Sequence, residues 1–148
     1  MDDLAQLGAK LALTELANRL YMYTDARNWA GLQNEVFAPE LWLDIASLGG
    51  GAPRTIAAKE LCEMWTQGFA ELDAVHHQAG QYLIEVQESQ ATIFAYAVAW
   101  HYKAAATQGH TRTFVGDYDL KATLTPTGWR LTQFKYNLKF ADGNATLA

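Results

Sequence analysis

Residues 74–85 of this 148-residue chain have the sequence AVHHQAGQYLIE, and the pattern of apolar residues changes here. Earlier in the chain apolar residues recur at helical spacing, whereas from Val75 onward they alternate with a period of two, as in strands. His76 and His77 stand at the beginning of the first predicted strand, and Gly80 follows shortly after them. Histidine has an unperturbed pKa of about 6.5, close to neutral pH. A buried, oriented histidine at this position is therefore a candidate proton carrier.

The C-terminal half of the chain predicts a sheet of four long strands. They are expected over residues 75–87, 91–104, 111–124 and 128–140, joined by turns at 88–90, 107–109 and 126–128. Such short connections predict an antiparallel meander. In the second strand, one face is expected to carry mainly small residues and a histidine, as the wall of a cavity would: Ile93, Ala95, Ala97, Ala99 and His101. In the last strand the alternation slips near Thr132 and Gln133, which predicts a bulge that curves the sheet.

The N-terminal half begins with a long predicted helix. It is expected to start at Asp2 or Asp3, either of which can cap it, and to run to about Asp25. Apolar residues on two opposite sides predict that this helix is sandwiched between other elements. The first side carries Leu13, Leu16, Ala17 and Leu20, and the second carries Leu4, Leu7, Leu11 and Met22.

Shorter elements are expected between the long helix and the sheet. Asn28 is the predicted cap of a helix over residues 29–37 that Pro39 ends, and a strand follows at 41–45. A glycine-rich loop at 47–53 leads to a helix over 55–72, capped by Thr55. Helices followed by a curved antiparallel sheet predict an α+β fold in which the sheet wraps the long helix and leaves a conical cavity. We expect one domain over residues 1–148, with a loose tail from about residue 141.

The composition argues against several classes of function. The net charge is −5 and the 11 basic residues are scattered, unlike those of a nucleic-acid-binding surface. No apolar run approaches the length of a membrane span and the N-terminus is acidic, so neither a membrane anchor nor a secretory signal is expected. The single Cys62 cannot form an internal disulfide, and its apolar neighbours predict a core thiol in a reducing, cytoplasmic compartment.

Three residues are candidates for a site in the cavity. Asp25 lies at the end of the first helix among apolar neighbours, so its carboxylate needs a hydrogen-bond donor unless it caps the next turn. His77 is either a proton-transfer group or a core histidine with satisfied hydrogen bonds. His101 either faces the cavity or caps the end of its strand. His76 is expected on the opposite side of the strand from His77, in a structural role.

The order of four short motifs resembles that of the nuclear-transport-factor-2-like (NTF2-like) superfamily, and within it the SnoaL-like branch. The motifs are Asp25-x-x-x-Trp29-x-x-Leu32, Phe37-Ala38-Pro39-Glu40, His76-His77-x-x-Gly80 and Gly128-Trp129-Arg130-Leu131. The resemblance covers about residues 4–138 and implies a cone-shaped fold, with about three helices packed on a strongly curved, mostly antiparallel sheet. Within this branch the chain looks most like scytalone dehydratase and its relatives.

The resemblance implies a function without cofactor or metal. Asp25, His77 and His101 match the catalytic positions of scytalone dehydratase. His77 would then be the general base, Asp25 would orient it, and His101 would hydrogen-bond the leaving oxygen or donate a proton to it. The implied reaction is the elimination of a leaving group from a small cyclic or aromatic hydroxy-carbonyl compound. The residues expected to contact this substrate are Tyr21, Tyr23, Trp29, Trp65 and Phe69.

The chain departs from scytalone dehydratase at the residues that hold the substrate. The two tyrosines that bind the carbonyl in that enzyme correspond to Thr24 and Ile45, and an amide-bearing residue corresponds to about Ala122. Scytalone itself is therefore not the expected substrate. Tyr21 and Tyr23, a turn or less away, either supply a phenol instead or serve as packing residues.

Two other functions are compatible with the same fold. One is a ketosteroid-isomerase-like proton shuttle, whose carboxylate base would fall at Ile45, one residue from Asp44. The other is a non-catalytic binding or assembly module, which predicts a filled cavity and an exposed apolar sheet face. Under both the enzyme and the module interpretations we expect a homo-oligomer, a dimer or a trimer. Its sheet contacts are predicted to include Trp42, Phe94, Tyr96, Trp100 and Tyr118.

Overall fold

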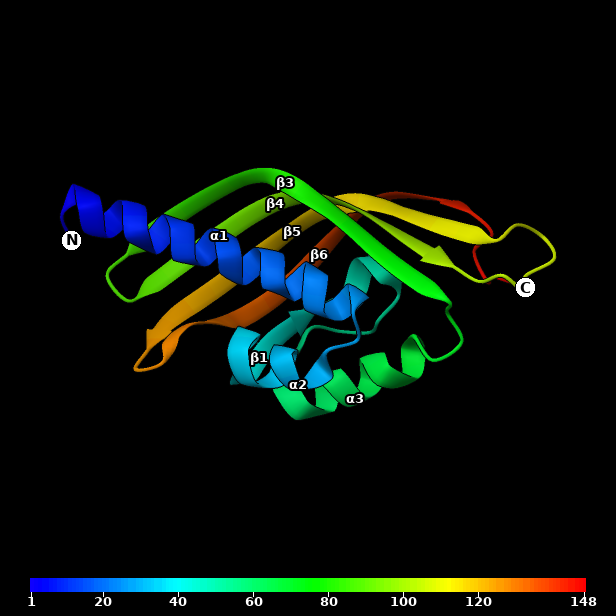
Figure 1. Cartoon of the computed structure of the whole chain (residues 1–148), viewed down its shortest axis with the longest axis horizontal. Coiled ribbons are helices and arrows are strands. Elements are labelled where there is room, and N and C mark those ends of the chain that lie inside the picture. The colour runs from blue at the N-terminus through cyan, green and yellow to red at the C-terminus, as the bar shows by residue number, and fades with distance from the viewer.

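A six-stranded sheet and three helices make up the computed structural model, which describes residues 1–148 (Figure 1). The helical elements are α1 (Asp3–Asp25), α2 (Trp29–Gly31), the π-helical turn η1 (Leu32–Val36), the 3-10 turn η2 (Ala46–Leu48) and α3 (Ala58–Gly68). The strands are β1 (Phe37–Asp44), β2 (Arg54–Ala57), β3 (Ala74–Gln87), β4 (Gln90–Tyr102), β5 (Thr111–Thr125) and β6 (Gly128–Gly143). The predicted α+β class is confirmed.

The sheet has the strand order β2-β1-β6-β5-β4-β3. Strands β3 to β6 form the predicted antiparallel meander, whereas β1 pairs with β6 in parallel. Lys121 pairs with Gln133 and Ala122 with Leu131, so Thr132 is the extra residue of the predicted bulge. In Figure 1 the long strands form one bent layer, with α1 lying along it and α2 and α3 grouped near β1. Bulges of this kind increase the local bend of a sheet and so help to form a hollow under it.

Helix α1 is buried on one side only. Its cap is as predicted, because the Asp2 side chain accepts a hydrogen bond of 2.7 Å from the N–H of Ala5. The side with Leu13 and Leu20 is fully buried against the sheet. The second apolar strip is 62–79% exposed, and it consists of Leu4, Leu7, Leu11 and Met22. The prediction of a sandwiched helix is therefore wrong, since no other element of the chain covers that side.

The boundaries of the shorter elements differ from the prediction. Asn28 caps α2 as expected, with its side chain accepting from the N–H of Gly31, but the helical segment ends at Val36 and Pro39 lies inside β1. The predicted cap at Thr55 is wrong, because residues 54–57 pair with β1 as a short strand. Helix α3 begins at Ala58 and ends at Gly68, short of Leu72. None of the helices combines the length and apolar composition that crossing a membrane requires.

The end of the chain is ordered, contrary to the expected loose tail. Strand β6 continues to Gly143, and Leu147 is only 2% exposed in a small apolar cluster with Leu72, Val75 and Ala106. The carbonyl of Ala148 accepts hydrogen bonds from the N–H groups of Thr107 and Gln108, at 3.0 and 3.2 Å. One buried leucine and these backbone hydrogen bonds fix the C-terminal segment beside the cavity, which Ala145 helps to line.

Candidate active site

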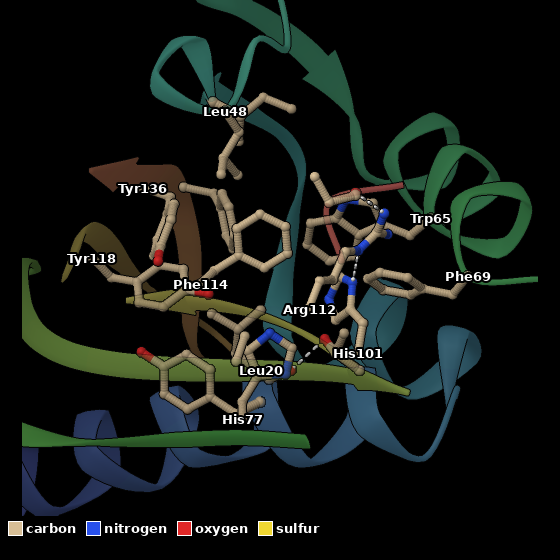
Figure 2. Close-up of a pocket in the computed structure, with 16 residues that line it drawn as sticks. Leu20, Leu48, Trp65, Phe69, His77, His101, Arg112, Phe114, Tyr118 and Tyr136 are labelled. Carbon is tan, nitrogen blue, oxygen red and sulfur yellow. Dashed lines mark hydrogen bonds between the residues drawn. The ribbon is translucent and has the colours of Figure 1, made fainter. Parts of the chain in front are cut away.

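A cavity of about 450 Å³ lies between the inner face of the sheet and the helices. Of the 16 residues that line it, 12 are hydrophobic, and they include Leu20, Trp65, Phe69 and Phe134. The other four are Thr24, His77, His101 and Arg112, while Tyr21, Tyr118 and Tyr136, which count among the 12, add hydroxyl groups. The cavity is open, so the filled cavity that the assembly-module interpretation predicts is not found. Figure 2 shows Tyr118 and Tyr136 on one side of the cavity, and His101 with Arg112 on the other.

The structure brings Asp25 and His77 together, as the sequence argument expected. Asp25 is the last residue of α1, and its Oδ2 accepts a 2.9 Å hydrogen bond from the backbone N–H of His77. Its Oδ1 lies 2.6 Å from His77 Nδ1. A carboxylate that accepts this hydrogen bond places a ring hydrogen on Nδ1, so in the neutral tautomer Nε2 is the nitrogen with the lone pair. The His77 side chain is 10% exposed and that of Asp25 is 19% exposed, so this interaction is largely shielded from water.

His101 faces the same cavity from the neighbouring strand. It pairs with Val75 while His77 pairs with Ala99, so the two histidines are diagonal neighbours on one face of an antiparallel pair. Arg112 Nε donates a 3.0 Å hydrogen bond to His101 Nδ1, which leaves the ring hydrogen on Nε2. Burial, followed by the nearby Arg112 and His77, lowers the pKa of His101 to about 4. His101 is therefore a neutral imidazole that presents an N–H group.

Arg112 is a site residue that the sequence analysis missed. It lies directly opposite His101 in the β4–β5 pairing. The signal was present in the sequence, because inward-facing residues of β5 alternate from Phe114 through Gly116 to Tyr118, and the same period places position 112 inward.

Three tyrosines with tilted, neighbouring rings line the cavity on the other side. The ring of Tyr118 lies 5.3 Å from that of Tyr21 and 4.9 Å from that of Tyr136, between centroids. The hydroxyl groups of Tyr21 and Tyr136 are buried and have no hydrogen-bond partner. Burial raises the pKa of all three phenols, that of Tyr136 to about 12, so each remains a neutral donor. Tyr118 was expected on the outer face, and that prediction is wrong because its register turns it inward.

The residues predicted to contact a substrate divide into two groups. Tyr21, Trp65 and Phe69 line the cavity. Tyr23 and Trp29 do not, which corrects the prediction: Tyr23 packs against Gly31, and the Trp29 ring stacks on the ring of Phe69, with 6.1 Å between centroids. Both belong to the packing between α1, α2 and α3 rather than to the cavity wall.

The positions that other enzymes of this fold use carry different groups here. Thr24 and Ile45 both line the cavity, but the Thr24 hydroxyl donates to the carbonyl of Leu20 at 2.6 Å. Asp44 lies outside the cavity, where it accepts from the N–H of Ala46 and lies 3.8 Å from Lys135 Nζ. The isomerase interpretation therefore lacks its carboxylate base.

Cys62 and the other histidines lie outside the site. Cys62 is a buried thiol whose pKa burial raises to about 11, which confirms the predicted core role. His76 is exposed on the outer face, where its ring lies 5.9 Å from that of Trp100. No group of three or more His, Cys, Asp and Glu side chains is arranged to hold a metal ion.

The unpartnered phenols lead to a prediction about stability. Tyr21→Phe and Tyr136→Phe should each stabilise the ligand-free protein by about 1 kcal/mol, because a buried hydroxyl without a partner carries an uncompensated desolvation cost. Urea unfolding of each variant measures this change. Tyr82→Phe is the control, since the Tyr82 hydroxyl donates to Asn18 Oδ1 at 2.6 Å and its loss should not stabilise the protein. A loss of stability in both cavity variants would show that these hydroxyls have a partner in solution.

With the fold and the cavity established, comparison with known proteins identifies the family. A model of the SnoaL-like domain matches residues 5–135. The chain belongs to the SnoaL-like domain family. This confirms the predicted placement in that branch of the NTF2-like superfamily. No curated protein matches this SnoaL-like protein.

Solved structures match the SnoaL-like protein over nearly its whole length. The Kfla4162 protein from Kribbella flavida is 27% identical, with a TM-score of 0.91 over 96% of this chain and 97% of that one. A Novosphingobium aromaticivorans protein provisionally assigned as a scytalone dehydratase is 12% identical, with a TM-score of 0.81 over 94% and 89% of the two chains. Hexachlorocyclohexane dehydrochlorinase LinA-type3 from Novosphingobium barchaimii is 13% identical, with a TM-score of 0.80 over 97% and 95%. At 12–13% identity, the last two show a shared fold.

Proposed function

We propose that this SnoaL-like protein is a cofactor-independent lyase. It removes water, or a comparable leaving group, from a small cyclic or aromatic hydroxy-carbonyl compound. The observation that carries the proposal is the double hydrogen bond from His77 to Asp25, which fixes the ring at a largely apolar cavity and leaves its other nitrogen, Nε2, without a protein partner. A fixed imidazole of this kind is suited to general-base catalysis, which typically contributes about 10²–10⁴-fold to a rate.

The proposed reaction begins with transfer of a proton from carbon to His77. Nε2 takes the proton from the carbon next to the substrate carbonyl, and the C–H electron pair forms an enolate. Asp25 stabilises the resulting imidazolium through Nδ1. The enolate then collapses to a carbon–carbon double bond as the C–O bond to the neighbouring carbon breaks. The proton held by His77 passes to the departing oxygen, which leaves as water and restores the neutral base.

The polarising group that the sequence could not identify is supplied, in this proposal, by the phenols. Tyr21 and Tyr136 have buried hydroxyl groups without partners, and their raised pKa values keep them protonated. Both hydroxyl groups are covered in the ligand-free protein, so in this proposal a small shift of the rings on substrate binding brings them to the enolate oxygen, where two neutral donors are stabilising. They would take the place of the tyrosines that scytalone dehydratase has at the positions of Thr24 and Ile45.

The proposed role of His101 is to hydrogen-bond the leaving oxygen. Its Nε2 carries a hydrogen because Nδ1 accepts from Arg112. The cation beside it opposes protonation of the ring, so His101 donates a hydrogen bond as a neutral group and His77 returns the proton. Of the two roles that the resemblance implied for His101, the geometry favours hydrogen bonding over proton donation.

The solved relatives agree with an elimination reaction. Two of the similar structures bear the names of a scytalone dehydratase and a hexachlorocyclohexane dehydrochlorinase. At 12–13% identity these names describe those proteins, and the fold alone hosts many activities. The proposal therefore depends on the Asp25–His77 geometry rather than on the neighbours.

The proposal is tested with His77→Gln and a panel of cyclic β-hydroxy ketones, including β-hydroxycyclohexanone and β-hydroxytetralone. The conjugated or aromatic products absorb in the ultraviolet, which allows turnover to be followed directly. We expect His77→Gln to lower turnover by about 10²–10⁴-fold while its thermal unfolding stays close to that of the wild type. His76→Gln is the matched control, because His76 lies on the outer face of the same strand.

Two results would contradict the lyase proposal. One is turnover per folded molecule that survives in His77→Gln. The other is tight binding of the panel compounds without conversion by the wild type, which would favour a non-catalytic binding protein of the same fold.

A further inference from the structure

We infer that Arg112 is an anion-binding residue and that the substrate of this site carries a carboxylate. The inference rests on the proposed function, because it concerns the same cavity and names the chemical class of the molecule that enters it. Arg112 lines the cavity, and no other Arg or Lys side chain does.

The guanidinium of Arg112 is held in place by groups that leave its charge uncompensated. Nε donates to His101 Nδ1 at 3.0 Å, and Nη1 donates to the carbonyl of Ala145 at 3.2 Å. Its carbon lies 5.8 Å from the centre of the Phe114 ring. Nη2 has no protein partner, and no Asp or Glu oxygen lies within 4.0 Å of any Arg112 nitrogen. The side chain is thus oriented in advance, with donors free for a ligand.

The charge around Arg112 supports an anionic ligand. The chain has a net charge of −5, yet no carboxylate of the protein pairs with this arginine. Asp25, the carboxylate nearest to the two histidines, has both oxygens engaged by His77. A guanidinium that is partly removed from water and lacks a counter-ion favours a ligand that brings one. Because the cavity is small and mostly apolar, a carboxylate with a single charge fits better than a doubly charged phosphate.

The sheet register places Arg112 at a useful distance from the reacting groups. On β5, Arg112 lies opposite His101 of β4. Two residues along, Phe114 lies opposite Ala99, which itself pairs with His77 of β3, and Tyr118 lies four residues beyond Phe114. The order on the cavity wall is therefore arginine, base and phenol, in agreement with Figure 2. A molecule whose carbonyl meets the phenols and whose carboxylate meets Arg112 has its middle carbons next to His77 Nε2. Arg112 then selects cyclic oxo acids over neutral ketones of the same shape.

The alternative role of Arg112 is to orient His101 and nothing more. The two roles differ in what they predict for binding of a ligand pair that differs only in charge. A carboxylate receptor prefers the charged member of the pair, whereas a residue that only positions His101 does not distinguish them.

The test measures binding of naphthoate and naphthamide by titration calorimetry. These probes have the same shape, and neither has a leaving group. We expect the wild type to bind naphthoate at least about tenfold more tightly, because charge-assisted hydrogen bonds to Arg are stronger than neutral ones. In Arg112→Gln the ratio should fall to about one, with naphthamide affinity little changed. Arg130→Gln makes the same change of net charge outside the cavity and should keep the wild-type ratio.

Two further measurements keep the inference open to refutation. If Arg112→Gln does not fold, raising the salt concentration should weaken wild-type binding of naphthoate but not of naphthamide. His77→Gln should keep the preference for naphthoate, so a failure of the lyase proposal and a failure of this inference give different results. Equal wild-type affinities, no wild-type binding of either probe, or a preference that survives in Arg112→Gln would overturn the role of Arg112.

Discussion

Asp25→Asn should lower turnover by about 10²–10⁴-fold while the protein remains folded. The reason is the tautomer of His77. An asparagine satisfies both hydrogen-bonding positions if its oxygen accepts from the His77 backbone N–H and its NH₂ group donates to Nδ1. The ring hydrogen then moves to Nε2, which becomes a donor and can no longer take a proton from carbon. In serine-protease triads the same aspartate-to-asparagine change costs about 10⁴-fold for the same reason.

The tautomer can be observed independently of any substrate. Nitrogen-15 NMR of the imidazole should show the hydrogen on Nδ1 in the wild type and on Nε2 in Asp25→Asn. Asp44→Asn is the control, since Asp44 lies outside the cavity beside Lys135. An Asp44→Asn variant without activity would favour the isomerase-like alternative, and an active Asp25→Asn variant with the hydrogen on Nε2 would refute the base mechanism.

The strands could be predicted because their alternation is a strong local signal, and the contact of Asp25 with His77 could be predicted because it follows from the fold together with the family resemblance. Alternation over thirteen residues of β4 determines which side of the strand faces inward. Once the sheet is known to wrap the first helix, a carboxylate at the end of that helix and an inward histidine at the start of β3 must lie close together. The resemblance to the SnoaL-like branch added the identity of these residues, which periodicity alone does not provide.

The sequences of the short strand β2 and of the C-terminal segment contain almost no pattern that indicates their structure. In β2 only Ile56 is buried, so four residues show no alternation that distinguishes a strand from the start of a helix. Leu147 is a single apolar residue in a polar tail, and its burial depends on a pocket made by Val75 and Ala106 from distant parts of the chain. Contacts of this kind are tertiary, and no local pattern contains them.

The second apolar strip of α1 shows a different limit of prediction from residue spacing. The spacing of Leu4, Leu7 and Leu11 correctly identifies an apolar side, but spacing does not say what covers it. In the structure of the single chain that side is exposed. Arg112 and Tyr136 show the converse case, because period-two alternation marks their strands while only the assembled cone shows that they face the same cavity as His77.

His101 should make the stability of the protein fall as the pH is lowered from about 6.5 to about 4. Burial and Arg112 lower the pKa of its folded-state imidazole from 6.5 to about 4. Between these values the unfolded chain binds a proton that the folded protein does not, so unfolding becomes more favourable as the pH falls. The stabilisation is fully present above the unfolded pKa, and the free energy lost by about pH 4 and below amounts to at most about 3.5 kcal/mol, at about 1.4 kcal/mol per pKa unit.

The measurement compares the pH dependence of urea unfolding in the wild type and in His101→Gln. Glutamine has no titrating group but can still accept from Arg112 and present an N–H group to the cavity. Between pH 7 and pH 4.5 the wild type should therefore lose about 2 kcal/mol more than the variant, whatever the other groups contribute to both. His110→Gln, which removes an exposed histidine, should follow the wild type. If the curves of the wild type and His101→Gln are parallel, His101 accepts a proton in the folded protein as readily as in the unfolded chain. It could then donate that proton to a leaving group, and the division of roles between the two histidines would have to be reversed.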